Sequence, residues 1–184
     1  RTVSLSLRSN DVIHSFWVPQ LAGKKDVLPG QENVIWFTPR TPGQYYGQCA
    51  EFCGIAHAQM RFRVFVDTSD EFERWAQAQR APAQEPPAGT LAAQGAELFQ
   101  RSACIGCHTV EGTRAQGRVG PNLTHVGGRT TIAAGVLENS EESLVRWITD
   151  AKAVKPGARM PSAQEMRLTP EQVEALAAYL GSLK

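Results

Sequence analysis

The stretch QCAEFCGIAHAQM, residues 48–60, places two cysteines, a histidine and a methionine close together. Three residues separate Cys49 from Cys53, three more precede His57, and two more precede Met60. A packed core gains nothing from this mixture, whereas thiolate, imidazole and thioether groups are familiar metal ligands. The stretch therefore predicts a metal site in this part of the chain. Which metal it holds depends on residues elsewhere.

Size and composition indicate a globular protein with one large domain or two small ones. The chain has 184 residues, of which 42% are hydrophobic, and its net charge is +1. Because neither half carries a strong excess of charge, we expect no nucleic-acid partner. No apolar run reaches the ~20 residues that a membrane-spanning helix needs. The abrupt strand-like start, RTVSLSL, leads us to expect a piece of a longer protein.

The first half has the pattern of a β domain. Apolar or alternating runs at 3–7, 34–37 and 62–66 predict strands, and the turn signals LPGQ and TPGQ lie between them. SDEFERWAQAQ predicts a short closing helix, for which Thr68 and Glu71 can form a capping box. The next segment, RAPAQEPPAG, is typical of a stiff linker. We therefore place a first domain at 1–80 and a linker at 81–90.

The second half, 91–184, has the pattern of a helical domain. Helices are predicted at 90–101, 140–151 and 169–183. Thr169 can cap the last helix, Pro170 suits its first turn, and Gln172 completes a capping box. Its apolar positions share one face, namely Val173, Leu176, Leu180 and Leu183.

The second domain contains CIGCH, residues 104–108, which is the C-x-x-C-H pattern of covalent haem attachment. Cys104 and Cys107 can each add to a vinyl group of one porphyrin, while His108 presents an imidazole to the iron. The alternatives are a disulfide and a redox C-x-x-C motif. The redox motif is disfavoured because no βαβ pattern surrounds it. Of two methionines that can supply a sixth ligand, we favour Met160 in a Gly/Pro-bounded loop over Met166, which suits core packing.

With these residues in hand, 90–184 resembles the class I cytochrome c family. Gly95 and Phe99, with Leu176 and Tyr179, match that family's crossing of terminal helices. The resemblance implies that the carbonyl of Pro121 in GPNL accepts the N–H of the His108 imidazole. It also implies that Arg129 lies near a haem propionate and Trp147 lies beside the haem, although ordinary surface and core roles remain open for both. His125 matches no ligand position, and we expect it on the surface.

Upstream of the first cysteine pair, DVIHSFWVP supplies a further histidine, His14. Two cysteines, two histidines and a methionine contain one thiolate too many for a single blue-copper ion. Zinc accepts cysteine and histidine but seldom has this spacing or uses methionine. Two copper ions bridged by both sulfurs would use every ligand. A Cys49–Cys53 disulfide stays open as an alternative.

This set resembles the CuA site of cytochrome c oxidase subunit II, through DVIHSFWVP, LPGQ and TPGQYYGQCAEFCGIAHAQM. The resemblance implies a cupredoxin-like Greek-key barrel, either complete or lacking edge strands that another polypeptide supplies. It implies that Cys49 and Cys53 bridge two coppers, with His14 and Met60 on one and His57 and the Glu51 carbonyl on the other. It further implies that the Glu51 carboxylate binds magnesium in the full complex, against the simpler alternative of a solvated carboxylate. The family's transmembrane helices are not matched here.

Copper domain, linker and haem domain in this order resemble subunit II of the caa-type oxidases. That resemblance implies an electron-entry subunit that takes electrons from a soluble cytochrome c or similar donor. The electrons would pass through haem and CuA to oxidase subunit I, where dioxygen is reduced. The resemblance also implies a place on the outer, periplasmic face of the bacterial cytoplasmic membrane, anchored by N-terminal helices. A nitric oxide reductase subunit with the same centres stays open, as does a copper-delivery or sensing protein.

Overall fold

The computed structural model describes all of residues 1–184 and divides them into two compact units. The first contains Arg1–Trp75, and the second is built from residues between Ala76 and Lys184. Neither unit contains a helix with the length and hydropathy of a membrane span.

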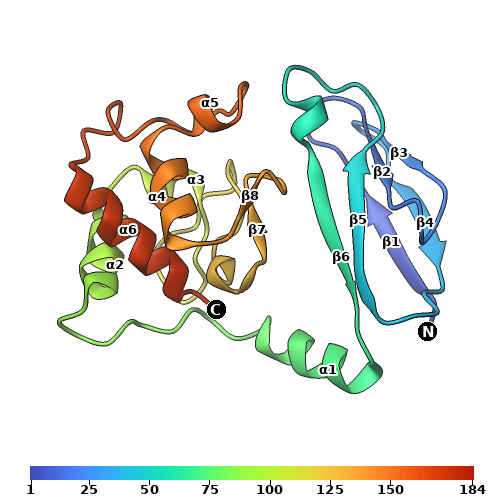
Figure 1. Ribbon diagram of the computed structural model, residues 1–184, viewed down its shortest axis with the longest axis horizontal. Coiled ribbons are helices and arrows are strands. Elements are labelled where there is room, and N and C mark those ends of the chain that lie inside the picture. Colours follow the sequence, from blue (N-terminus) through green and yellow to red (C-terminus); the bar gives the residue numbers. More distant parts are fainter. The chain divides into compact units, whose positions relative to one another are not determined.

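The first unit consists of two antiparallel sheets, as Figure 1 shows. One pairs β1 with β4, and the other has the order β3-β2-β5-β6. The strand bounds are β1 Val3–Leu7, β2 His14–Trp17, β3 Lys25–Val27, β4 Asn33–Phe37, β5 Gly43–Cys49 and β6 Arg61–Val66. β1 pairs with β4 alone. The predicted β class is thus confirmed.

Between β5 and β6 the pairing is close enough to require a glycine. Gly47 lies opposite Phe62, and a Cβ at Gly47 would come within 2.2 Å of the Phe62 ring. The freed space lets that ring stack on Phe16 of β2, with centroids 4.9 Å apart. The ends of β2, β5 and β6 are thereby held together. Short helices follow: η1 (His57–Gln59) before β6 and α1 (Ser69–Ala78) after it, the latter with the predicted Thr68/Glu71 capping box.

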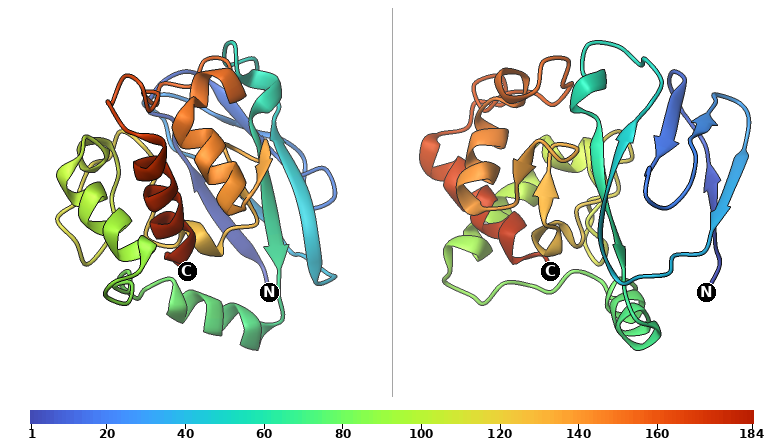
Figure 2. Two further views of the ribbon diagram at one scale, coloured as in Figure 1. Left: turned by 60° about the vertical axis from the view of Figure 1, so that its left-hand side comes forward. Right: turned by 45° about the vertical axis from the view of Figure 1, so that its right-hand side comes forward.

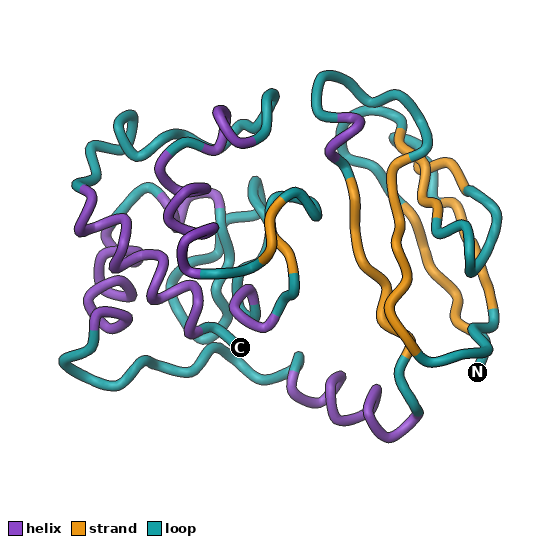
Figure 3. Tube along the Cα trace, in the orientation of Figure 1, coloured by secondary structure: helices purple, strands orange, loops and turns teal.

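The second unit is mainly helical, with long loops that Figure 3 draws in teal. Its helices are α2 Leu91–Arg101, α3 Cys104–Cys107, η2 Val126–Gly128, α4 Glu141–Thr149, α5 Ala151–Val154 and α6 Pro170–Ser182. The predicted helices and the Thr169/Gln172 capping box are present. A small hairpin of β7 (Thr131–Ile132) and β8 (Leu137–Glu138) departs from the all-helical expectation. Its turn residues, Ala133, Ala134 and Gly135, have positive φ angles, which helical periodicity in the sequence does not predict.

The core of this unit lies where α2 crosses α6, which Figure 2 shows from two sides. A Cβ at Gly95 would lie 1.9 Å from the carbonyl oxygen of Ala175, so only glycine permits this approach. Phe99 and Tyr179 meet across the crossing with ring centroids 5.6 Å apart. Burying these side chains holds the two helices together. The remaining chain loops around this crossing and carries the C-x-x-C-H motif.

Candidate metal centres

Neighbouring strands bring the first predicted ligand set to one end of the larger sheet. His14 begins β2, Cys49 ends β5, and Met60 immediately precedes β6. Backbone hydrogen bonds connect these positions: the Cys49 N–H donates to the Met60 carbonyl at 2.9 Å, and the Ala50 N–H donates to the Ser15 carbonyl at 3.1 Å. The sheet register therefore brings His14 next to Cys49 and Met60, although His14 is distant from both in the sequence.

Two free thiols form the centre of this cluster. The sulfurs of Cys49 and Cys53 are 3.8 Å apart, whereas a disulfide requires about 2.05 Å. The Nδ1 of His14 lies 3.9 Å from the Cys49 sulfur, and the Nδ1 of His57 lies 3.5 Å from the Cys53 sulfur. The Met60 sulfur is 3.8 Å from that of Cys53. Each thiol thus has an imidazole beside it.

The backbone also contributes an oxygen to this cluster. The Glu51 carbonyl oxygen lies 3.2 Å from the Cys49 sulfur. The Glu51 carboxylate lies elsewhere, 3.8 Å from the Lys24 ammonium, which is also 3.6 Å from Asp26. The carbonyl and the carboxylate of Glu51 therefore face different surroundings, and the magnesium role of the carboxylate stays a prediction.

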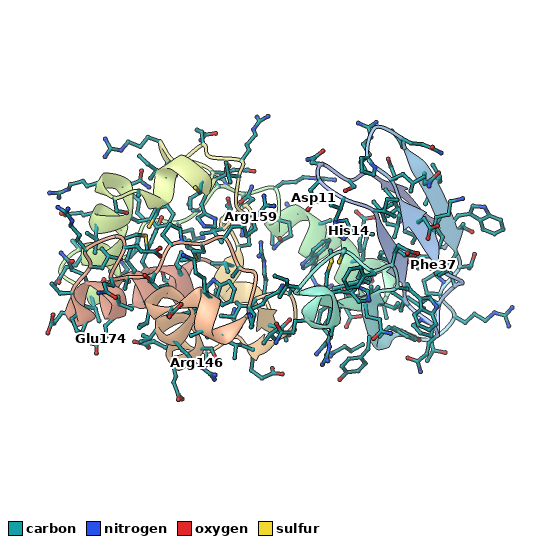
Figure 4. The ribbon with its side chains drawn as sticks, turned by 90° about the horizontal axis from the view of Figure 1, so that it is seen from above. Asp11, His14, Phe37, Arg146, Arg159 and Glu174 are labelled. Carbon is teal, nitrogen blue, oxygen red and sulfur yellow. The ribbon has the colours of Figure 1, made fainter.

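Asp11 fixes the orientation of the first histidine, as can be followed from the labels in Figure 4. The Nε2 of His14 lies 2.8 Å from an Asp11 carboxylate oxygen, so this nitrogen carries the proton and Nδ1 faces the sulfurs. This hydrogen bond is the main reason that the pKa of Asp11 falls to about 2. Burial opposes ionisation of Cys49, but backbone groups of Glu51 and Ser15 and the His14 side chain lower its pKa to about 7. Cys49 thus ionises more readily than an ordinary cysteine, whereas burial, with the neighbouring Cys49, raises the pKa of Cys53.

In the second unit, α3 carries both cysteines of the C-x-x-C-H motif, and the chain turns to extended backbone at His108. The His108 Nδ1 lies 2.8 Å from the Pro121 carbonyl oxygen, as the resemblance implied. Since a carbonyl only accepts, Nδ1 carries the proton and Nε2 is left as a donor to a metal. Gly120 makes room for this ring, because a Cβ there would lie 2.4 Å from it.

The remaining predicted haem residues occupy separate elements. Met160 lies in the loop between α5 and α6, is half-buried and packs against the core. Trp147 on α4 packs against the same core. Arg129 is an exposed residue, and its guanidinium donates to the Asn122 carbonyl at 2.6 Å. His125 differs from expectation: it is half-buried, with Nδ1 3.1 Å from the Lys184 carbonyl, because the end of the chain folds against it.

Comparison with known proteins matches both units. Residues 1–67 match the family model described as cytochrome c oxidase subunit II, periplasmic domain, and residues 92–184 match the cytochrome c model. Cytochrome c oxidase subunit 2 of Alkalihalophilus pseudofirmus is 44% identical over 182 residues, covering 99% of this chain and 52% of the relative. Subunit 2 of Bacillus sp. (strain PS3) is 39% identical over 191 residues, with 99% and 53% covered. The chain belongs to the cytochrome c oxidase subunit II family, with a cytochrome c domain fused to it.

The chain spans about half the length of the curated subunit II relatives it matches. A subunit II periplasmic domain implies CuA copper, and a cytochrome c domain implies haem c. The residues present fit both groups. Ligand atoms of His14, Cys49 and Cys53 lie within 4.8 Å of one another, and two sulfurs 3.8 Å apart can both lie about 2.3 Å from one ion placed between them. The glycine cradle and the fixed tautomer of His108 suit an axial haem ligand.

The subunit II site also contains features that the sequence patterns did not predict. Asp11 orients His14, and the carboxylate three residues before a ligand histidine was the signal available in DVIH. Large apolar side chains stand exposed beside the candidate ligands: Phe52 is 77% and Ile55 84% exposed, and Val12 and Ile13, which precede His14, are also exposed. Single exposed apolar residues are common, so these side chains are notable only because they all lie next to candidate ligands in the sequence.

Proposed function

We propose that this subunit II chain is an electron relay of a haem–copper terminal oxidase. It would take one electron at a time from a soluble cytochrome c or similar donor at its haem domain. It would then deliver that electron through its copper domain to subunit I, where dioxygen is reduced to water. The proposal places the chain on the periplasmic face of the bacterial cytoplasmic membrane. Membership of the subunit II family and the convergence of soft ligands in the first unit support it.

In the first unit, we assign each ligand a role that suits transfer rather than bond-making. Cys49 and Cys53 would hold two coppers in common, with His14 and Met60 on one side and His57 and the Glu51 carbonyl on the other. When bound, the copper pair and the haem supply one-electron redox chemistry. Because Asp11 holds the His14 imidazole from outside, that ligand keeps its position when the charge of the site changes. A rigid ligand set keeps reorganisation small.

In the second unit, we assign Cys104 and Cys107 as the residues that would form thioether bonds to a haem, and His108 and Met160 as those that would hold its iron. Pro121 keeps the His108 proton on Nδ1, which strengthens the opposite nitrogen as a donor. Arg129 and Trp147 are proposed to lie at a propionate and beside the ring. Methionine opposite histidine raises the reduction potential, which suits a carrier that accepts electrons from another cytochrome.

The 3.8 Å separation of the Cys49 and Cys53 sulfurs, with an imidazole beside each, carries this proposal. Metal analysis of the purified protein should give about two coppers per haem. Electron paramagnetic resonance should show hyperfine coupling of one unpaired electron to two copper nuclei. Coupling to a single nucleus, or a Cys49–Cys53 disulfide in copper-replete protein, would refute the assignment.

A second measurement separates the oxidase from the nitric oxide reductase that the same two centres also suit. The catalytic subunit that co-purifies with the full-length protein should consume dioxygen with reduced cytochrome c as donor. Nitric oxide reduction by that complex, without oxygen consumption, would instead favour the reductase. Rapid exchange of copper with chelators would favour a delivery role.

A further inference from the structure

The loop that carries Met160 is tied by its downstream flank. The Ser162 N–H donates to a Glu165 carboxylate oxygen at 2.7 Å, and the Glu165 N–H donates to the Ser162 hydroxyl at 3.2 Å. This reciprocal pair fixes the backbone that begins two residues after Met160. The Ala163 N–H also donates to the Thr149 carbonyl at 3.0 Å. The segment that follows the methionine is therefore held at two points.

The same carboxylate ties the loop to its upstream flank. The Lys152 ammonium on α5 lies 2.9 Å and 3.1 Å from the two Glu165 carboxylate oxygens. α5 is itself anchored, because Asp150 caps it by accepting from the Lys152 and Ala153 N–H groups, both at 3.0 Å. The Lys152–Glu165 contact thus closes a loop that has Met160 inside it.

This closure is half-exposed, with Lys152 49% and Glu165 53% exposed, so it adds little to the stability of the whole unit. Its local effect is larger. A methionine side chain is long and flexible and its thioether is a neutral ligand, so its hold on iron depends on the backbone that presents it. Opening the loop would let Met160 leave without unfolding the α2–α6 core.

We propose that Lys152, Glu165 and Ser162 form a clamp that keeps Met160 in place as the sixth haem ligand. Glu165 is the central positioning residue, because its carboxylate joins both flanks of the loop. The inference rests on the Met160 ligation assigned under the proposed function. It goes beyond that assignment by naming the residues that set how firmly the methionine is bound.

The test uses the full chain with haem attached. Glu165→Ala removes the contacts of the carboxylate with both the Lys152 ammonium and the Ser162 N–H, whereas Lys152→Ala removes the ion pair alone. Lys152→Arg keeps the positive charge and can pair with both carboxylate oxygens, so the clamp should persist. Glu174→Ala is the matched control, because Glu174 is an exposed carboxylate on α6 outside the clamp (Figure 4).

Two readouts follow the ligand itself. The first is the thioether-to-iron absorption band of the ferric protein, and the second is the rate at which added imidazole displaces the methionine. Glu165→Ala should exchange roughly three- to tenfold faster than the native protein, with Lys152→Ala in between. Glu174→Ala and Lys152→Arg should exchange at the native rate.

Equal exchange rates in Glu165→Ala and Glu174→Ala overturn the clamp. A lower melting temperature of Glu165→Ala with an unchanged exchange rate also overturns it, since the network would then be structural only. Should Glu165→Ala not fold, Lys152→Ala and Glu165→Gln test the same contact, because both break the ion pair. A native ferric protein without any thioether band instead refutes Met160 ligation, and so separates failure of the proposed function from failure of the clamp.

Discussion

Replacing Gly95 with alanine tests whether the α2–α6 crossing holds the haem-bearing unit together. The new Cβ would lie 1.9 Å from the Ala175 carbonyl oxygen and 2.9 Å from the Tyr179 Cβ. Real Cβ atoms stay at least 3.0 Å from such neighbours, so the helices must separate by about 1.1 Å (3.0 − 1.9) at this point. The nearest obstacle is backbone, which cannot rotate away.

The cost of this separation can be worked from the buried side chains. Phe99 and Leu176 are 2% and 1% exposed, so both are packed on all sides and lose contacts when the helices separate. A gap of about 1 Å forfeits a quarter to a half of each contact. With some 40 contacts of ~0.1 kcal/mol each, the loss is about 1–2 kcal/mol for each of the two side chains. Alanine returns about 1 kcal/mol through its higher helix propensity. The net loss in the free energy of unfolding is about 2 kcal/mol.

Denaturant titration followed by haem absorbance measures this loss, because that signal reports only the second unit. The midpoint should fall while the denaturant slope stays constant. Gly181→Ala is the control on α6: its Cβ meets only Leu144, at 3.9 Å, so it should be neutral or slightly stabilising. If Gly95→Ala proves as stable as Gly181→Ala, the crossing does not depend on this glycine.

Three further changes give distinct outcomes. Arg167 has a φ of +57°, which is strained for any residue with a side chain. Arg167→Gly should raise the free energy of unfolding by about 0.5 kcal/mol, because it relieves ~1–2 kcal/mol of strain and costs less than that in the entropy of the unfolded chain. An unchanged thermal unfolding curve would contradict this. Gly120→Ala should push the His108 ring aside and convert part of the ferric haem to high spin by absorbance, whereas Gly106→Ala, which meets nothing, should not. The hydrogen bond to Lys152 lowers the pKa of Glu165 from 4.5 to about 2. The small excess in melting temperature of the native protein over Glu165→Gln should therefore be complete above pH 4.5 and disappear toward pH 2. An advantage that persists at pH 2 would count against that pairing.

The sequence was most informative where a structure depends on neighbours in the chain. The capping boxes at Thr68/Glu71 and Thr169/Gln172 follow from side chains three residues apart, and both are present. The C-x-x-C-H motif is equally local, because α3 carries both of its cysteines in one helical turn. Candidate ligands could therefore be named from spacing and from the family resemblance, and their role as ligands stays a prediction.

Features that depend on tertiary approach could not be predicted in the same way. The β7–β8 hairpin turns through Ala133, Ala134 and Gly135, all at positive φ, and only Gly135 is of a residue type that predicts this conformation. The Lys152–Glu165 contact joins exposed charges thirteen positions apart, a pattern that any solvated surface shows. Only the folded loop distinguishes that contact from the background.

The two metal sites differ in a way that the donor residues alone do not reveal. His14 turns Nδ1 toward the sulfurs because Asp11 occupies its Nε2, whereas His108 keeps Nε2 free because the Pro121 carbonyl occupies its Nδ1. The outer partner therefore decides which nitrogen remains for the metal. One partner is a carboxylate and the other a neutral carbonyl, so Asp11 adds negative charge at the proposed copper site that Pro121 does not add at the proposed haem site. Removing the Asp11 carboxylate should thus change both the orientation and the charge of its site, while a shift of Pro121 changes orientation alone.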